Sequence, residues 1–179
     1  MKHNFFKIVA VLVFTVLAVS TTFAQSSANA TATVSARIIN PISISKDANM
    51  NFGVVVPGGT AGTVLLATDG TRSIGSGGTT ILSGQTGSPA VAQFTVSGEP
   101  TYTYSISFPA SITIKDAATD SMAVNSFVHI ATSGTEGTIP AGGTQVLKFG
   151  ATLNVGAIAD QPHGAYTNTT AFKVTVNYN

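Results

Sequence analysis

The 179-residue sequence contains no cysteine and no tryptophan, and only 8% of its residues are charged. Without cysteine, the chain can form neither a disulfide framework nor a thiolate zinc site. A typical soluble domain is about 25% charged. The eight Lys and Arg residues are too few to neutralise many phosphates, which argues against nucleic-acid binding. The hydrophobic content of 44% argues against disorder driven by charge.

The first 24 residues have the layout of a secretory signal peptide. Two lysines precede an apolar run at 8–19, and small Thr22 and Ala24 precede a cleavage position before Gln25. This run is shorter than the roughly 20 residues that a membrane-spanning helix needs, so no transmembrane segment is expected in the mature chain. We therefore expect an exported protein, in the periplasm, on the cell surface or outside the cell, whose residues 25–179 form one domain.

The mature sequence is typical of an all-β protein. Branched and aromatic apolar residues dominate, period-2 alternation is common, and Gly and Pro clusters recur between the alternating runs. No window repeats apolar residues at helical spacing for three turns, so we expect no substantial helix. The Gly- and Ser-rich residues 75–89 predict a long loop with a possible short strand. About ten short strands without helices predict an antiparallel β-sandwich of immunoglobulin-like or pilin-like type. The clearest strands are expected at 28–38, 91–96, 102–108, 122–130, 145–155 and 172–178.

The two ends of the mature chain carry alternating strands that could serve in assembly. An open sheet edge is a template for pairing with another chain. If the first strand left its own domain, it could add to a sheet of a neighbouring copy, with backbone bonds giving affinity and alternate side chains entering pockets. Alternation alone is equally compatible with a strand that pairs within its own sheet. The candidate assembly residues are Ala28, Ala30, Ala32, Val34, Ala36, Ile38, Phe172, Val174, Val176 and Tyr178.

Several segments resemble a known bacterial family. They are 36–44 (ARIINPISI) followed by Asn51-Phe52-Gly53, 92–98 (AQFTVSG), 149–157 (FGATLNVGA), and 164–166 leading to 174–178 (VTVNY). In this order they are similar to DUF4402, a family of domains of unknown function. The resemblance implies an exported, mainly β domain and no established activity.

The ends are more distantly similar to spore-coat-U-like proteins and to chaperone–usher pilins. The penultimate Tyr178 matches the pilin pattern, whereas the Cys pair of many pilins is missing. This likeness implies copies of the chain or related subunits as partners, together with a periplasmic chaperone.

Catalytic and metal-binding patterns are poor. His129 lies between Val128 and Ile130 and is expected to point to the face opposite these neighbours, either exposed or hydrogen-bonded. With His163 in a Gly- and Pro-containing loop, it gives no set of metal ligands. Asp116 and Asp120 fit solvated turn acids better than a calcium loop.

Other patterns are weak as well. The Gly-rich residues 75–78 lack the Lys and the helix of a phosphate loop. Tyr102 and Tyr104 share one strand face and could stack on a sugar, although core packing explains them better. We expect no enzyme, no metal and no cofactor.

Two functions from different classes remain. The first is an exported structural surface subunit that polymerises by strand exchange into a pilus- or coat-like assembly. The second is a monomeric secreted or surface module that binds a glycan or protein through loops at one end of the sandwich. The candidate loops are 75–89, 115–121 and 157–168.

Overall fold

The computed structural model describes residues 27–82, 84, 87–118, 120–130, 136–168 and 172–179. The predicted signal peptide, residues 1–24, lies outside the described residues. The chain divides into two compact units between Arg37 and Ile38. In the first unit, the described residues 27–37 carry no regular secondary structure and are exposed.

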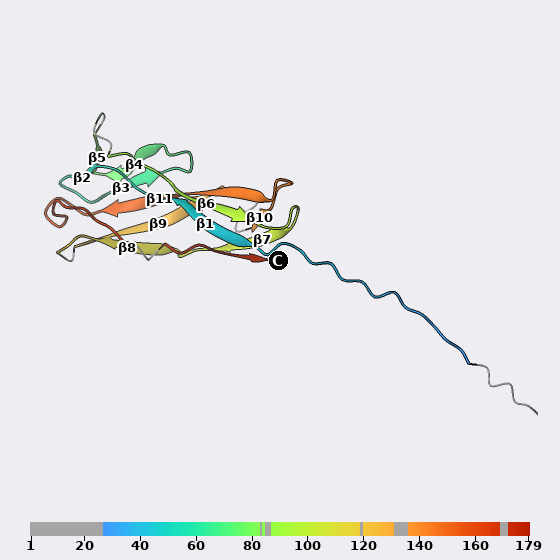
Figure 1. Ribbon diagram of the computed structural model, residues 1–179. Coiled ribbons are helices and arrows are strands. Elements are labelled where there is room, and N and C mark those ends of the chain that lie inside the picture. The colour runs from blue at the N-terminus through green and yellow to red at the C-terminus, as the bar shows by residue number, and fades with distance from the viewer. Residues whose placement is uncertain (1–26, 83, 85–86, 119, 131–135, 169–171) are drawn as a thin grey trace, which may run out of the picture. The chain divides into compact units, whose positions relative to one another are not determined.

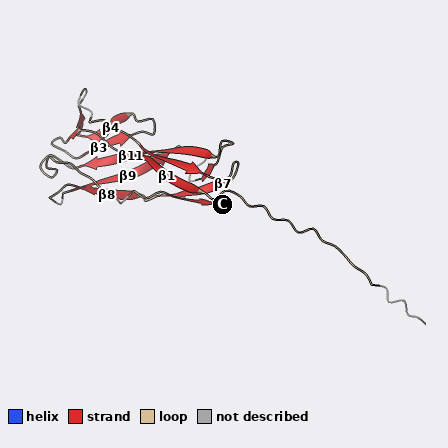
Figure 2. Ribbon diagram, viewed as in Figure 1, coloured by secondary structure: helices blue, strands red, loops and turns tan. Residues whose placement is uncertain are grey.

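The regular secondary structure of the second unit consists of strands, and the described residues contain no helix (Figure 2). None of these residues forms a helix long and apolar enough to cross a membrane. The strands are β1 (Ser43–Ala48), β2 (Val55–Val56), β3 (Gly62–Leu66), β4 (Arg72–Gly77), β5 (Thr80–Ile81), β6 (Ala92–Ser97), β7 (Thr103–Ser107), β8 (Ser111–Lys115), β9 (Ser121–His129), β10 (Glu136–Thr138), β11 (Thr144–Val155) and β12 (Thr175–Tyr178).

These strands form an antiparallel β-sandwich, which confirms the predicted fold class (Figure 1). The larger sheet has the order β1-β6-β11-β3-β4, and β9 extends it from the other side of β11 and pairs in turn with β8. The smaller sheet has the order β10-β7-β12. Strands β2 and β5 form a separate short ribbon.

Strand β11 connects the two halves of the core. Residues 144–149 pair with β6, and residues 151–155 pair with β3 on the same side of the strand. On the opposite side, β9 pairs along residues 149–154. The inward side chains of β11 alternate with outward ones and are all buried; they are Leu147, Phe149, Ala151, Leu153 and Val155. The first two belong to a core cluster shared with the smaller sheet, and the last three to a second cluster under β3 and β9.

A β-bulge in β9 changes which side chains face the core. Ser126 has a φ of 50°, and the register between β9 and β11 shifts at this point. A bulge adds one residue to a strand and therefore reverses the alternation beyond it. As a result, Phe127 and His129 point inward, whereas Val128 is 53% exposed. His129 does lie on the face opposite Val128 and Ile130, as predicted, but this is the inner face, so the expectation of an exposed or hydrogen-bonded ring is wrong: the ring packs against aromatic side chains and its buried Nδ1 has no partner among the described residues.

Four other strand predictions need correction. Residues 28–38 form no strand within a single chain, because the first strand begins at Ser43. The predicted loop at 75–89 holds the end of β4, although its possible short strand is confirmed as β5. Strand β10 was not predicted, since EGT has no apolar alternation. Strand β12 begins at Thr175 instead of Phe172, although Phe172 still packs against the core.

Candidate assembly site

Two sheet edges meet along one side of the sandwich without pairing. Strand β1 is an edge of the larger sheet and β12 is an edge of the smaller sheet. The two strands approach each other, but no backbone pairing joins them among the described residues. We call this boundary the β1–β12 seam. An unpaired edge exposes backbone N–H and C=O groups that can bind a further strand.

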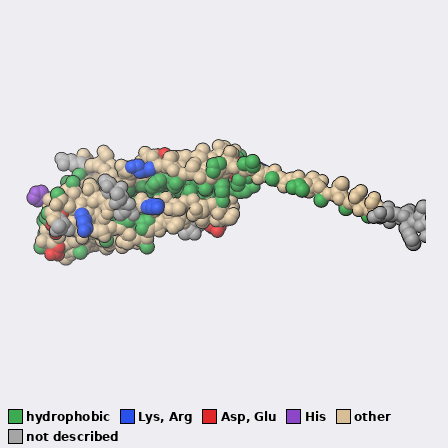
Figure 3. Space-filling view, turned by 60° about the horizontal axis from the view of Figure 1, so that its bottom comes forward, with side chains coloured by type: hydrophobic (Ala, Val, Ile, Leu, Met, Phe, Trp, Pro, Cys, Tyr) green, Lys and Arg blue, Asp and Glu red, His purple; other side chains and the backbone are tan. Residues whose placement is uncertain are grey.

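Apolar side chains line the seam. Val174 and Val176 are buried in the core cluster, at 9% and 8% exposure. Ile42 and Ile44 pack against the same cluster from the β1 side and are only partly buried, as are Phe172 and Tyr178 from the other side. Figure 3 shows apolar side chains gathered in a band along the body of the sandwich. The seam therefore leaves part of the hydrophobic core in contact with solvent.

The exposed N-terminal segment, residues 28–38, has a complementary pattern. Val34 is 95% exposed and Ile38 is 97% exposed. Apolar residues at even positions alternate with Asn29, Thr31, Thr33, Ser35 and Arg37. In a strand, this alternation would place one apolar face toward a core and one polar face toward solvent. The predicted assembly residues thus fall into two groups, namely an exposed segment at 28–38 and a group at 172–178 that is buried or partly buried in the core.

A hydrogen-bonded clamp holds the chain where the N-terminal segment joins the sandwich. The Tyr178 hydroxyl donates to the Asn40 carbonyl oxygen at 2.8 Å and accepts from the Glu99 N–H at 2.6 Å. Glu99 Oε2 accepts from both the backbone N–H and the side-chain amide of Asn40, each at 3.1 Å. Tyr102 packs edge-on against the Tyr178 ring, with centroids 5.8 Å apart. We call Asn40, Glu99 and Tyr178 the Asn40 clamp.

A glycine makes room for this clamp. A Cβ atom at Gly98 would collide with the Tyr178 hydroxyl. Any larger residue at position 98 would therefore move the hydroxyl away from its partners in the clamp.

His129 lies in an aromatic cluster next to the seam. Its ring centroid is 5.2 Å from that of Phe149 and 5.3 Å from that of Phe108. Phe149 also contacts Phe172, which precedes β12 and packs against the same core cluster. His129 Nδ1 is buried and has no hydrogen-bond partner among the described residues. Burial therefore lowers the pKa of His129, because the charged form loses its hydration.

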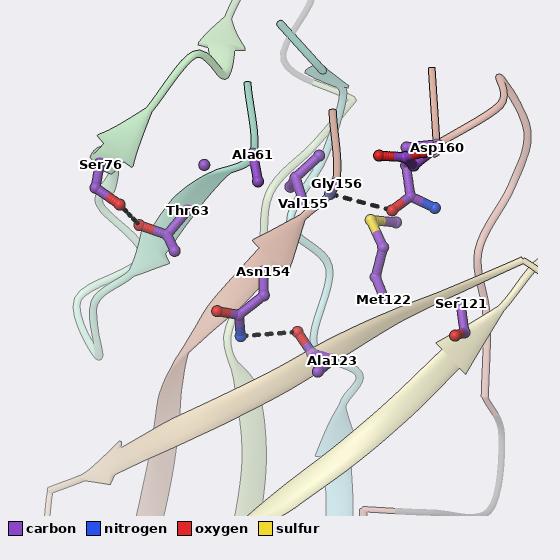
Figure 4. A pocket seen from close by; sticks show the side chains of 12 residues that line it. Ala61, Thr63, Ser76, Ser121, Met122, Ala123, Asn154, Val155, Gly156 and Asp160 are labelled. Atoms are coloured by element: carbon purple, nitrogen blue, oxygen red, sulfur yellow. Dashed lines mark hydrogen bonds between the residues drawn. The ribbon is translucent and has the colours of Figure 1, made fainter. Parts of the chain in front are cut away.

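A shallow depression of about 490 Å³ lies where β11 ends, on the side of the sandwich away from the C-terminus (Figures 1 and 4). It brings together residues from all three candidate loops, namely Ser76, Ser121 and Asp160. Gln161 also lines the depression and is 6% exposed, and its Oε1 accepts from the Gly156 N–H at 3.2 Å. Its Nε2 is buried without a partner among the described residues. Each of the three candidate ranges therefore contributes to the lining of this depression, the first two through the strand residues Ser76 and Ser121.

The remaining candidates have structural roles. Tyr104 is fully buried, its hydroxyl donates to Gln145 Oε1, and burial raises its pKa to about 12. Asp116 Oδ1 accepts from the N–H groups of Ala118 and Asp120, each at 2.9 Å, which shapes a turn. Within the described part of the chain, no three His, Asp or Glu side chains come together as metal ligands.

Sequence reasoning missed the clamp and the bulge. Asn40 and Tyr178 are 138 positions apart, and Asn40 and Glu99 are 59 apart. The one local signal for the clamp is Asn40-Pro41, because the residue before a proline is held extended.

The two packed sheets and the open seam define an antiparallel β-sandwich domain. Among the described residues, the outer edge of β12 pairs with no other strand. The sequence matches the model of DUF4402, described as a domain of unknown function, over residues 42–178. The chain belongs to this family, as the sequence resemblance predicted. Searches among curated proteins and among solved structures found no match. The matched range starts at the seam residue Ile42 and leaves residues 28–38 outside.

Proposed function

We propose that this protein is an exported structural subunit that assembles by strand exchange. Residues 28–38 of one copy would add to the β12 edge of the next copy, with their apolar side chains over the β1–β12 seam. The proposal assigns no catalytic activity to the chain. Its place of action would be the periplasm, the cell surface or the extracellular space, as the signal-peptide pattern predicts.

The main support for the proposal is that the same chain has both an open seam and an exposed segment that could cover it. At the seam, Ile44 of β1 and Tyr178 of β12 pack against the core and are only partly buried. The segment exposes Val34 and Ile38 almost completely. Each of these surfaces costs free energy in water, and each would be covered by the other. Strand addition would also satisfy backbone groups of the β12 edge.

The composition supports the same proposal. Soluble monomers commonly protect sheet edges with Lys and other charges. The mature chain carries six basic and seven acidic residues, and the one charged residue in 28–38 is Arg37. A surface that meets other copies of the chain has less need of charge than one that faces water.

The donor and acceptor surfaces are different, so the contact is head-to-tail. Such a contact does not close on itself by a two-fold axis, and its repetition makes a filament or a ring. The more distant likeness of the ends to chaperone–usher pilins and spore-coat-U-like proteins is in line with this arrangement. It adds a periplasmic chaperone as a partner that would cover the seam before assembly.

Deletion of residues 25–37 tests the proposal. The secreted full-length protein should run as a series of oligomers in size-exclusion chromatography with light scattering, and should release monomers only on heating in detergent. The deleted protein should remain a folded monomer, with its folding checked by circular dichroism. A full-length protein that is entirely monomeric would refute strand exchange.

A second candidate function is a glycan-binding module at the depression near Gln161. The buried, unpartnered Gln161 amide and the polar rim of Ser76, Ser121 and Asp160 support it. A glycan array probed with the secreted protein separates the two functions. Asn154 also lines the depression. Binding that survives deletion of residues 25–37 and is lost in Asn154→Ala would favour the module, and uniform absence of binding would exclude it.

A further inference from the structure

The Asn40 clamp fixes the relative direction of the two strands at the seam. Asn40 lies just before β1, whereas Tyr178 is the last residue of β12. The clamp therefore joins the start of β1 to the end of β12, so the two strands run in opposite directions (Figure 1). A strand placed between them must be parallel to one and antiparallel to the other.

This geometry restricts how a chain could fill its own seam. To do so, residues 28–38 would have to turn back at 39–42 and run antiparallel to β1, as in a hairpin. The type I′ turn that commonly closes a hairpin needs a positive φ at both central residues. Pro41 has a fixed φ and no N–H. Both backbone groups and the side chain of Asn40 are already held by Glu99 and Tyr178.

From this we infer that the Asn40 clamp makes the β1–β12 seam selective for a strand from a second copy of the chain. The inference rests on the proposed strand exchange, and it explains why the inserted strand comes from another copy and not from the same chain. With the clamp closed, the turn needed for self-insertion is blocked, while the seam stays open to a neighbour's residues 28–38. With the clamp released, residues 39–42 gain the freedom to form that turn.

Tyr178→Phe weakens the clamp, because it removes two of the four hydrogen bonds and leaves the two between Asn40 and Glu99 Oε2. It keeps the ring that packs against Tyr102 and removes the hydroxyl that bonds both Asn40 and Glu99. Tyr166→Phe is the matched control, because its hydroxyl donates to the Pro162 carbonyl oxygen at 2.8 Å in a loop outside the clamp.

Engineered disulfides report which copy fills the seam. The natural chain has no cysteine, so each disulfide identifies the designed pair. In a self-inserted chain, residue 38 would lie near Tyr178 and position 35 near position 175. Ser35→Cys is therefore combined with Thr175→Cys, and with Lys173→Cys or Asn177→Cys to cover neighbouring registers, since a disulfide requires Cα atoms within about 7 Å.

Non-reducing electrophoresis of the full-length secreted protein separates the outcomes. With Tyr178 intact, the cysteine pairs should give a ladder of crosslinked copies. In the Tyr178→Phe background, the ratio of intramolecular to intermolecular crosslinks should rise about tenfold, which corresponds to ~1.4 kcal/mol, and Tyr166→Phe should leave it unchanged.

Two results would overturn the inference. One is an equal ratio in Tyr178→Phe and Tyr166→Phe. The other is intramolecular crosslinking that already dominates with Tyr178 intact. In both cases crosslinks at the seam still form, so strand pairing itself stands. If no crosslink forms in any register with Tyr178 intact, strand exchange fails and the role of the clamp fails with it.

Discussion

Substitution of Val34 tests whether the N-terminal segment is a donor strand. Val34 is 95% exposed in the single chain, so Val34→Asp should leave the free energy of unfolding of the sandwich unchanged. In the assembly, Val34 would be buried over the seam. Burying a valine side chain stabilises by about 1.5–3 kcal/mol, and each 1.4 kcal/mol changes a dissociation constant about tenfold. The loss of burial alone therefore weakens binding about 10- to 150-fold.

The charge adds to this loss, because a carboxylate placed over the core would have no partner. Thr33→Asp is the matched control. It introduces the same charge one position away, where alternation places the side chain toward solvent. The difference between the two variants therefore isolates the direction of the side chain from the effect of the charge.

The binding assay uses a labelled peptide of residues 27–39 and the protein that lacks residues 25–37. Fluorescence anisotropy gives the dissociation constant of the natural, Val34→Asp and Thr33→Asp peptides. Val34→Asp should bind at least about tenfold more weakly than Thr33→Asp. Equal weakening by both changes, or no binding of the natural peptide, would refute the reasoning.

Two further predictions concern the sandwich itself. Phe149→Ala removes a fully buried ring and should lower the free energy of unfolding by about 3–5 kcal/mol in urea titrations, whereas Val146→Ala, at a position 49% exposed on the same strand, should change it by less than about 1 kcal/mol; equal effects would contradict the packing described. His129 has a pKa below its ordinary value of 6.5 in the folded state, so the unfolded chain takes up the proton first as the pH falls. Its contribution to stability is therefore complete above pH 6.5 and declines as the pH falls below that value. His129→Phe should flatten this part of the profile of unfolding free energy against pH, and an unchanged slope would count against the cause given.

The alternating pattern predicted the fold because period 2 reports directly on a half-buried strand. Residues 91–96 illustrate this, since Phe94 and Val96 are buried and Gln93 and Thr95 are not. The same rule correctly placed His129 opposite Val128 and Ile130, but the bulge at Ser126 inserts one residue into the count, so that His129 and not Val128 faces the core. No side chain near Ser126 signals a positive φ, so the reversal could not be read from the sequence.

The candidate site was predictable only in part. Alternation alone indicated that Val174 and Val176 share one face of a strand, and it predicted a strand at 28–38 that the single chain does not form. The relation between these two segments was not predictable, because it depends on which sheet edges end up next to each other. The clamp depends on hydrogen bonds between residues far apart in the chain, such as Glu99 and Tyr178. The alternation of neighbouring residues does not predict hydrogen bonds between residues so far apart in the sequence.

The pairing of β1 with β6 determines how the domain would respond to force. A pull on the N-terminal segment first loads the Asn40 clamp and then passes along β1 from Ser43. Antiparallel hydrogen bonds lie perpendicular to their strands, so a pull directed along β1 shears the whole register from Ser43 to Ala48 at once. Strand β6 passes the tension to β11, which spans both halves of the core. In a filament under tension, the load would thus be shared across the sheet instead of opening one bond at a time.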